Sequence, residues 1–530
     1  MLKSSGAIAA ATLSSRLLGL VREMVYAGFM GDKRVAGAFK FAFMIPNLFR
    51  RLLGEGALTA AFIPIFKEKE KASGEQEMWR AANAVISGLV VVSAAIIGLV
   101  LLGISLALAE HSFQPDRELM LRLLRLMFPY MLFVCLAAVF MGILNTRGHF
   151  FIPAMGATML NLAMIASVLL LAPRMGRQLQ EQIFALAIGV LVAGVAQAAF
   201  QLPTLWREGF RYRWVSPWRN QTVRRVIRQM IPATLGVATF QINVTLVQSI
   251  SFWVDPRINA SFDYAVRLME LPQGMFGISL ATYLLPALSE LAVEKKFGEF
   301  RATLRYGLGT LFFLNLIAAL LLVVLAGPIV RLLFERGEFT SASTARASFA
   351  LMCLAPGLVA FSTVNVLARA FYALGDTKTP MNISVACLVL NLVFSAALLW
   401  RFPTNYKQGG LGIANTLSAI CNLLMLAYGL RRKLSRLELS ALRRPVLILT
   451  GAGLLGGLIA WWISQTWERV LGHNTLVLKM GAVFAPATVA ALVYCGLALW
   501  AKVPAAQEIT GLVFRRFRAA PDPATSGPGR

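Results

Sequence analysis

Charged side chains interrupt three apolar segments that would otherwise suit a lipid bilayer. These segments read ATLSSRLLGLVREMVYAGFMG, AFKFAFMIPNLFRRLLGEGALTAAFIPIF and FDYAVRLMELPQG. Their charged residues are Arg16, Arg22, Glu23, Lys40, Arg50, Arg51, Glu55, Asp263, Arg267 and Glu270. A charge at the bilayer centre costs roughly 2.5–3.5 kcal/mol on insertion scales, so several in one chain indicate a water-filled, positively lined cavity. Such a cavity suits an anionic ligand.

Helix geometry separates the two adjacent arginines of the second segment. Arg51 and Glu55 are four residues apart and share a helix face, so they can neutralise each other. Arg50 projects about 100° away from Arg51 on a helix with 3.6 residues per turn. We therefore assign Arg51 and Glu55 to structure and Arg50 to the cavity.

The same reasoning selects one arginine of the first segment. Arg16 and Glu23 are seven residues apart and share a face, whereas Arg22 lies about 120° from Arg16. Arg22 is therefore the freer ligand of this helix. A structural alternative for both Arg22 and Arg50 is a helix-end arginine whose charged group reaches the membrane interface.

Arg267 has two acidic neighbours on its own helix. Asp263 precedes it by four residues and Glu270 follows by three, so the three can form a self-contained ion-pair cluster. In the functional alternative, the two acids hold Arg267 in position for a ligand. Three arginines from three helices would suit a pyrophosphate, because guanidinium binds phosphate in a bidentate manner. An exporter of cations would instead need acidic groups in its cavity.

Composition predicts an all-α polytopic membrane protein. The chain has 530 residues, of which 58% are apolar and 14% charged. Apolar runs predict about 14 transmembrane helices. They lie near 6–30, 36–66, 80–109, 119–145, 151–172, 182–206, 231–254, 260–292, 306–333, 346–374, 380–400, 411–430, 446–467 and 476–500.

The loops between these spans predict the orientation of the chain. Loops such as KEKEKASGEQEMWR and WREGFRYRWVSPWRNQTVRRVIRQ are rich in Lys and Arg, and all the strongly basic loops fall on one side. Because basic loops face the cytoplasm, both termini are expected there. The net charge of +26 therefore favours contact with anionic membrane lipids and argues against a nucleic-acid partner.

The chain contains an internal duplication. Pro129 and Pro356, Gly148 and Gly375, and Pro153 and Pro380 are all separated by 227 residues. This predicts two pseudo-symmetric six-helix lobes of equal orientation, with a ligand site between them. The predicted domains are an N-terminal lobe at 1–222, a C-terminal lobe at 223–440, two further helices at 441–502 and a cytoplasmic tail at 503–530. The two further helices are either added helical bulk or a groove for a long hydrocarbon tail.

The remaining reactive residue types indicate no catalytic or metal centre. The five cysteines lie in apolar spans without a CxxC pair, and the three histidines are scattered in or near loops. An enzyme acting on polyprenyl phosphates would need clustered acid, base or metal-binding groups. We therefore expect no cofactor, no metal and no enzymatic activity.

Two groups of motifs resemble a known family. SSRLLGLVREMV and AFKFAFMIPNLFRRLLGEGALTAAFIPIFKEKEK resemble the N-terminal signature of the MurJ (MviN) lipid II flippases of the MOP transporter superfamily. YAVRLMELPQGMFGISLATYLLPALSE and ARAFYALGDTKTPMNIS are similar to the signatures of the eighth helix and of the tenth to eleventh helices in that family. The likeness runs from the first residues through the fourteenth span.

The resemblance implies functional residues by motif. The pyrophosphate-binding arginines of the family fall on Arg22, Arg50 and Arg267, and Arg16 lies in the same first motif as Arg22. The supporting or gating residues implied with them are Glu23, Lys40, Arg51, Glu55, Asp263 and Glu270.

This chain departs from the family pattern at two positions. The family usually has an Asp where this chain has Gly37, and a Lys where it has Met44. Lys40 lies one turn before Met44 on the same face, where it would supply the displaced charge. Loss of the Asp puts in doubt any gating ion pair that uses it.

The function implied by the resemblance is transport of lipid II, a polyprenyl-pyrophosphate disaccharide-pentapeptide, between the leaflets of the bacterial cytoplasmic (inner) membrane. The cell-wall synthesis machinery is a further implied partner. Two alternatives remain within the superfamily, namely a flippase for another polyprenyl-linked glycan and a MATE-like exporter.

Overall fold

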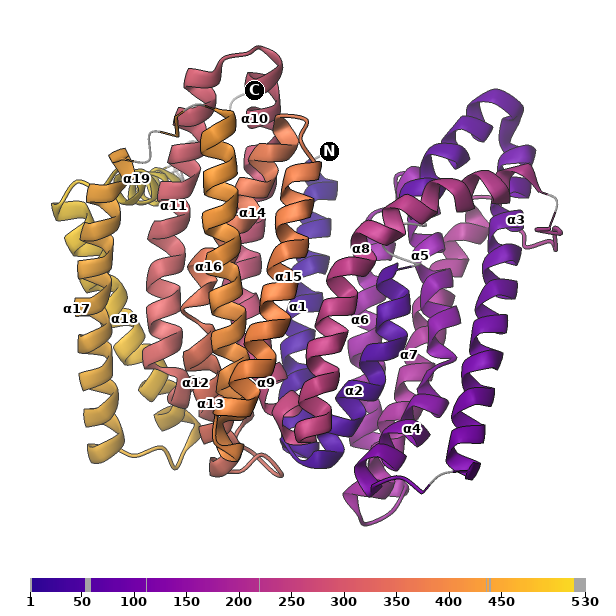
Figure 1. The fold of residues 1–530 in the computed structure, drawn as a ribbon, viewed down its shortest axis with the longest axis horizontal. Coiled ribbons are helices and arrows are strands. Elements are labelled where there is room, and N and C mark those ends of the chain that lie inside the picture. Colours follow the sequence, from indigo (N-terminus) through magenta and orange to yellow (C-terminus); the bar gives the residue numbers. More distant parts are fainter. Residues whose placement is uncertain are drawn as a thin grey trace, which may run out of the picture. The chain divides into compact units, whose positions relative to one another are not determined.

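The computed structural model is helical throughout the part of the chain that it describes (Figure 1). It describes residues 2–52, 59–110, 112–218, 220–434, 436–437 and 440–518. No strand occurs within these ranges. The predicted all-α class is therefore confirmed.

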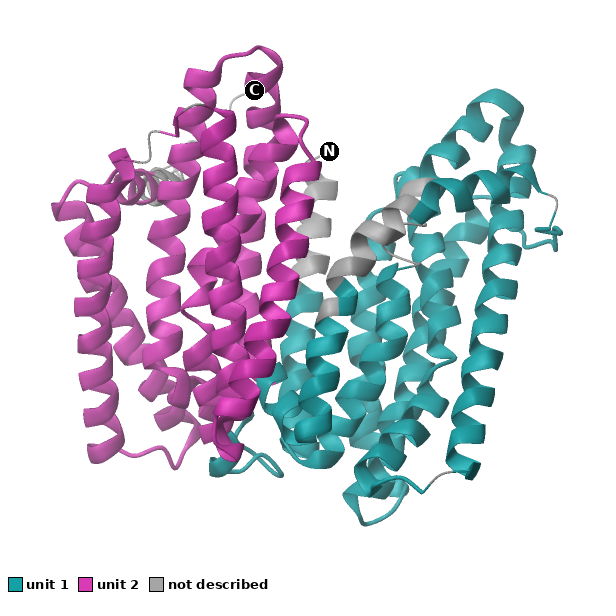
Figure 2. Ribbon diagram, in the orientation of Figure 1, with its two compact units in different colours: residues 1–263, 334–344 teal, residues 264–333, 345–530 magenta. Residues whose placement is uncertain are grey.

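The chain divides into two compact units (Figure 2). Unit 1 comprises Met1–Asp263 and Phe334–Thr344, and unit 2 comprises Tyr264–Leu333 and Ala345–Arg530. Residues 334–344 therefore belong to unit 1, although the chain before and after them belongs to unit 2. The predicted lobe boundary between residues 222 and 223 stays a prediction.

Unit 1 is a helical bundle with two apolar cores. Its helices are α1 Leu2–Met30, α2 Arg34–Phe49, α3 Thr59–Glu110, α4 Pro115–Met127, α5 Tyr130–Thr146, α6 Phe151–Ala166, α7 Leu179–Arg207 and α8 Gln221–Val254. The first part of α9 (Pro256–Pro272) also belongs to it. Gly74 adopts φ 83° and ψ 175° and divides α3 into two helices. One core centres on Phe39, Phe128 and Tyr130, and the other on Phe66 and Phe210.

Unit 2 begins within α9 and continues through ten further α-helices. They are α10 Ser279–Val293, α11 Phe297–Val324, α12 Ala326–Phe334, α13 Ser341–Leu354, α14 Gly357–Ala373, α15 Lys378–Arg401, α16 Lys407–Lys433, α17 Ser440–Val470, α18 Leu476–Trp500 and α19 Pro504–Arg518. Its main core joins α10, α11, α14 and α16 around Phe300 and Phe371. The Tyr494 hydroxyl of α18 donates to the Phe313 carbonyl of α11 at 2.9 Å, which ties the last long helix to this bundle.

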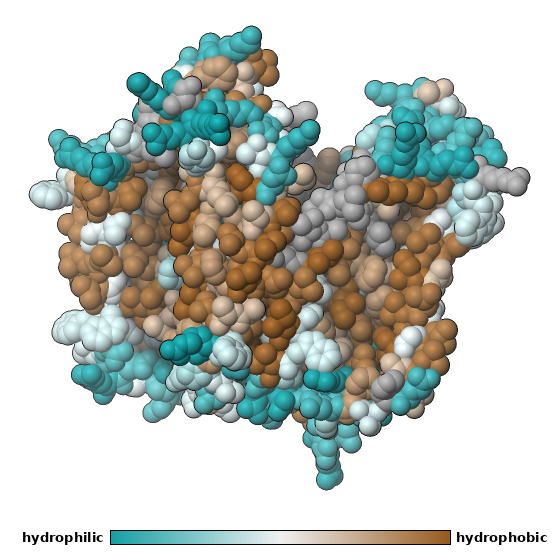
Figure 3. Space-filling view, in the orientation of Figure 1, coloured by the Kyte–Doolittle hydropathy of each residue, from teal (hydrophilic) through white to brown (hydrophobic). Residues whose placement is uncertain are grey.

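The predicted spans fall on helices where the structure describes them. Nine helices in the described ranges are long and apolar enough to cross a membrane, and two bent pairs bring this number to eleven. The three remaining predicted spans lie on α1, on α2 with the start of α3, and on α8. In Figure 3 the apolar side chains of each unit form a band, with hydrophilic side chains at its two edges. The chain is therefore a multi-pass membrane protein.

The duplication predicted from sequence has matching local structure in both copies. The pair α4 and α5 bends by 43° at Pro129, and the pair α13 and α14 bends by 46° at Pro356. Both α5 and α14 then end in the same turn, in which Gly148 (φ 86°) and Gly375 (φ 73°) take left-handed backbone conformations. The amide following each glycine donates to the carbonyl five residues before it. These positions therefore require glycine in both copies.

In each copy, a hydrogen bond that involves a carboxylate joins the residue after this glycine to the end of a later helix. His149 contacts Glu208 at 2.8 Å at the end of α7, whereas Asp376 accepts from Lys433 at 2.7 Å at the end of α16. Arg147 also donates to Glu208, at 2.9 Å. The hydrogen bond with His149 is the largest of the causes that hold the pKa of Glu208 below its usual value. The Lys433 ammonium, followed by the Thr379 amide, lowers the pKa of Asp376 to about 2.

Asp376→Asn should lower the free energy of unfolding by about 1 kcal/mol at pH 7, because solvent screens this partly exposed pair. The folded-state pKa lies below the ordinary value of 3.8, so the stabilisation is present above that pH and is lost as the pH falls toward 2. The melting temperature in detergent should therefore differ between variant and wild type from pH 7 to pH 5. The difference should narrow below pH 4.

The matched control is Glu77→Gln, which removes an ion pair with Arg80 whose side chains are 48% and 68% exposed. This variant should leave the melting temperature unchanged. Equal melting temperatures for Asp376→Asn and wild type at pH 7 would show that the Asp376 pair does not stabilise the turn.

Candidate functional site

Helix α1 carries an arginine and a glutamate in direct contact. Arg22 Nη2 lies 2.5 Å from Glu23 Oε1, and their side chains are only 13% and 6% exposed. The Arg22 guanidinium also lies 5.5 Å from the centre of the Tyr26 ring. Arg16, two turns earlier, is exposed.

The expectation that Arg22 is the freer side chain of this helix is wrong. Adjacent residues project about 100° apart, but the long Arg22 side chain bends toward the Glu23 carboxylate. The contact neutralises both groups in a setting where a lone charge would be costly. The proposed role of Arg22 in ligand binding stays a prediction.

The middle of α2 is joined to the start of α9 by a partly buried ion pair. Lys40 Nζ donates to Asp263 Oδ2 at 2.9 Å and to the Ala260 carbonyl at 3.5 Å. The two charged side chains are 12% and 25% exposed. Nearby, Phe41 stacks on Phe252 of α8 with ring centres 4.7 Å apart. Asp263 therefore holds a lysine 223 residues away, and its expected contact with Arg267 stays a prediction.

Arg50 and Arg51, which follow α2, do not lie in the regular α-helix that the sequence analysis assumed. Residues 50–52 form a π-helical turn, which follows Pro46 inside α2. Arg51 Nη1 donates to Gln241 Oε1 on α8 at 3.1 Å, and Arg50 is half-buried. The expected partner of Arg51, Glu55, lies outside the described residues, so that pair stays a prediction.

In unit 2, α9 holds the third candidate arginine. Arg267 Nη1 donates to Glu270 Oε2 at 3.0 Å, and the two side chains are 39% and 51% exposed. A π-helical turn, Gln273–Ile278, follows directly after Pro272. Such turns are rare and occur often at functional sites. The spacing of three residues predicted this contact correctly.

Sequence reasoning missed a buried carboxylate in unit 1. Asp32, only 2% exposed, accepts from Ser261 Oγ at 2.7 Å and from Ser343 Oγ at 2.6 Å. The serines are 229 and 311 residues away, so no local spacing could have indicated this cluster. The polar residues after Gly31 read as an ordinary loop.

The backbone accounts for the glycine found where the family has an aspartate. A Cβ atom added at Gly37 would lie 2.0 Å from the Pro256 carbonyl oxygen. Gly37 and Lys40 are three residues apart on one face of α2, and both approach the start of α9. A side chain at position 37 would therefore push α9 away from α2.

Three of the candidate cations share one kind of contact. Three cations of the predicted site, Arg22, Lys40 and Arg267, each contact a carboxylate that reduces the cost of burying the positive charge. Within the described ranges, no group of three His, Cys, Asp or Glu side chains could hold a metal ion.

Comparison with known sequences identifies the relatives of this chain. The family model described as lipid II flippase MurJ matches residues 26–481. A Vibrio cholerae protein named probable lipid II flippase MurJ is 35% identical over 492 residues, covering 88% of this chain and 92% of the relative. A Burkholderia cenocepacia protein named lipid II flippase MurJ is 33% identical over 464 residues, covering 85% and 88%.

Solved structures agree on the fold. A structure described as lipid II flippase MurJ in an inward closed conformation matches with a TM-score of 0.74 and 21% identity. The match covers 96% of this chain and 99% of that one. An inward-facing MATE transporter of the MOP superfamily matches with a TM-score of 0.63 and 17% identity, covering 80% and 95%.

Gly37→Ala should destabilise the protein by about 1–3 kcal/mol, because its methyl group would overlap a backbone carbonyl that no side-chain rotation can move. The melting temperature in detergent measures this effect. Gly98→Ala in α3 is the matched control, since nothing lies within 4 Å of the added Cβ, and it should be neutral or stabilising. Equal melting temperatures for the two variants would mean that α2 and α9 do not touch at Gly37.

Proposed function

Because the chain belongs to the lipid II flippase MurJ family, we propose that it moves lipid II from the cytoplasmic to the periplasmic leaflet by alternating access. The observation that carries this proposal is the set of basic side chains on apolar segments that the sequence predicts to span the membrane. Of these segments, the one with Arg267, Pro256–Val293, is also long and apolar enough in the structure. A pyrophosphate provides the negative charge that such side chains would neutralise. The activity is transport and not catalysis.

The pyrophosphate would be bound by Arg22, Arg50 and Arg267, with Arg16 as a further ligand. Guanidinium keeps its charge at every physiological pH and presents paired donors to phosphate oxygens. The Glu23 contact with Arg22 and the Glu270 contact with Arg267 support this role, because a carboxylate holds each guanidinium before the ligand arrives. A pyrophosphate carries more charge than one carboxylate and would therefore compete for these donors.

The other members of the predicted set would support the site. Lys40 and Asp263 would fix α2 to α9 and serve as a gating pair in place of the aspartate replaced by Gly37. Arg51 would hold α2 to α8 through Gln241, and Glu55 remains its expected second partner. The excess of positive charge would be neutralised by the cargo, which would allow the two lobes to change orientation.

The proposed location is the bacterial cytoplasmic membrane, with both termini in the cytoplasm. The concentration of Lys and Arg in one set of loops supports this orientation. The polyprenyl tail would remain in the lipid along α17 and α18, whose outward side chains are largely apolar. The enzymes of cell-wall synthesis would supply lipid II on one side and use it on the other.

A second candidate function is export of another anionic or lipid-linked molecule. The similarity in fold to a MATE transporter keeps this candidate open, since fold alone does not determine cargo.

Replacing Arg22, Arg50 or Arg267 singly by alanine should weaken binding of lipid II by roughly 10- to 100-fold, because each loses charge-assisted hydrogen bonds to phosphate. Binding would be measured with purified protein in nanodiscs made of zwitterionic lipid. Arg51→Ala is the control and should change the melting temperature more than the affinity, because Arg51 contacts Gln241. Unchanged affinity in all three variants would show that these arginines are structural.

Competition between cargo molecules separates the two candidate functions. Unlabelled lipid II should displace labelled lipid II at least tenfold more effectively than a polyprenyl-pyrophosphate that carries a different glycan. Equal displacement would favour a flippase with broader specificity. Displacement by small amphipathic drugs, and not by either lipid, would favour an exporter.

A further inference from the structure

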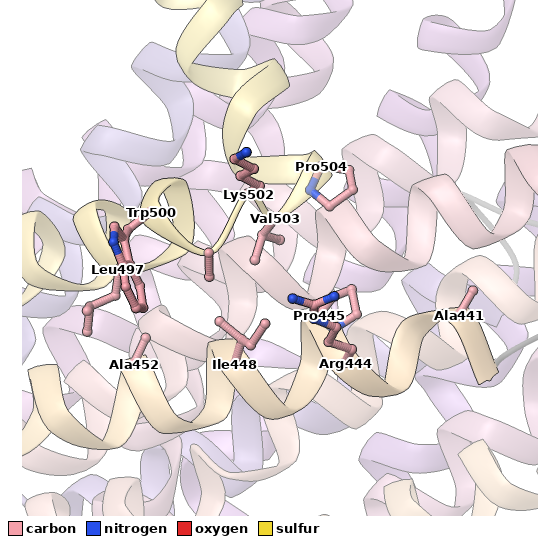
Figure 4. A pocket seen from close by; sticks show the side chains of 11 residues that line it. Ala441, Arg444, Pro445, Ile448, Ala452, Leu497, Trp500, Lys502, Val503 and Pro504 are labelled. Carbon is pink, nitrogen blue, oxygen red and sulfur yellow. The ribbon is translucent and has the colours of Figure 1, made fainter.

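One end of unit 2 contains a cavity away from the arginines discussed above. It has a volume of about 800 Å³ and lies where α17 begins, where α18 ends and where the chain turns into α19 (Figure 4). Ile448 and Ala452 of α17 and Leu497 of α18 form part of its apolar wall. Arg444 and Lys502 are the charged residues among those that line it.

The two basic side chains are available to an incoming anion. Arg444 and Lys502 are both exposed, and neither forms an ion pair with a carboxylate of the described residues. Glu508, the acidic residue of α19, does not line the cavity. The cavity is therefore positively charged at one side and apolar at the other.

The backbone fixes Lys502 at the end of α18. Its φ is 55°, a left-handed conformation that glycine usually adopts at this position of a helix end. The Val503 amide donates to the Ala498 carbonyl and the Lys502 amide to the Leu499 carbonyl, which closes the turn. A non-glycine residue in this conformation costs roughly 1 kcal/mol. The turn thus places a lysine beside the cavity, where glycine would be less strained.

Trp500 indicates at which level of the membrane the cavity lies. Its side chain lines the cavity and is 84% exposed at the last residue of α18. Tryptophan concentrates at the level of lipid headgroups, where the ring contacts acyl chains and the indole N–H contacts water. The basic side chains next to it therefore lie at the level of lipid phosphates.

We propose that this cavity is a binding site for an anionic phospholipid. The phosphate lies between Arg444 and Lys502, and the first part of an acyl chain lies on Ile448, Ala452 and Leu497. Basic pockets between transmembrane helices bind anionic headgroups in this way. A zwitterionic phospholipid fits the cavity less well, because the cation of its headgroup would lie against the two basic side chains. A soluble phosphate also fits less well, because it has no apolar part to contact the apolar wall.

This cavity is separate from the proposed pyrophosphate site, although α17 and α18 also carry the proposed path of the polyprenyl tail. It involves none of Arg22, Arg50 and Arg267, and its ligand is a lipid of the surrounding bilayer. A test of headgroup binding can therefore fail while lipid II binding persists, and the reverse also holds.

Fluorescence quenching tests occupancy of the site. The protein would be reconstituted in nanodiscs containing brominated phosphatidylglycerol or brominated phosphatidylcholine, with bromines near the start of the acyl chain. Trp500→Phe removes the reporter, so the difference in quenching between wild type and this variant isolates Trp500. We expect at least twice as much Trp500 quenching by the anionic lipid at equal lipid content. Equal quenching by both lipids would overturn the proposal and indicate ordinary lipid contact.

Charge removal tests the role of the basic pair. In the double variant Arg444→Gln and Lys502→Gln, binding of a fluorescent phosphatidylglycerol in mixed micelles should weaken about tenfold, while binding of phosphatidylcholine should not change. The control variant, Arg431→Gln with Arg432→Gln, removes the same charge from exposed positions in the last turn of α16 and should have no effect. Equal loss in both variants would show attraction by net charge and overturn the site.

Two further measurements test whether the double variant is folded and which ligand occupies the cavity. Lipid II binding in zwitterionic nanodiscs should be normal in the Arg444→Gln and Lys502→Gln variant, which shows that the variant is folded and its cargo site intact. If lipid II displaces the fluorescent phosphatidylglycerol at stoichiometric amounts, the cavity belongs to the cargo and the proposal is wrong. Displacement by inorganic phosphate alone would likewise assign the cavity to a soluble anion.

Discussion

The cost of placing charge inside a bilayer governs this structure. Each candidate cation with a described partner meets this cost in a similar way, by contact with a carboxylate or amide. The pairs are Arg22 with Glu23, Lys40 with Asp263, Arg51 with Gln241 and Arg267 with Glu270. Such pairs make burial tolerable, but they do not by themselves stabilise the fold, because desolvation offsets much of the attraction. A protein that needed only stability would use apolar residues at these positions. The charged pairs are therefore one observation that supports the proposed binding of an anionic ligand.

Features that depend on neighbouring residues could be predicted from the sequence. The apolar runs located the helices, and prolines and glycines at equal spacing located bends and turns that have the same geometry in both copies. The i to i+3 spacing of Arg267 and Glu270 also indicated their contact. In each case the controlling interaction lies within one or two helical turns, where chain geometry leaves few alternatives.

Contacts made across the fold could not be predicted in this way. The Asp263 carboxylate meets Lys40, 223 residues away, and Asp32 meets two serines more than 200 residues distant. The prediction for Arg22 was wrong for a different reason. Helix geometry fixes the direction of the Cα–Cβ bond, but a long flexible side chain can place its charged end elsewhere. Residue spacing therefore indicated the Glu270 partner of Arg267 but not the partners of Lys40 and Asp32.

Gly37 stands where the resemblance to the family predicts an aspartate. Lys40, on the same face of α2, makes a charged contact one turn further on. Without a side chain at 37, α2 and the Pro256 carbonyl approach closely, and this approach brings Lys40, one turn further on, within 2.9 Å of Asp263. An aspartate at 37 would separate the two helices and lengthen that ion pair. The glycine and the lysine thus act together, because the close approach at Gly37 lets Lys40 reach an acid on α9. A partly buried ion pair therefore joins the two helices.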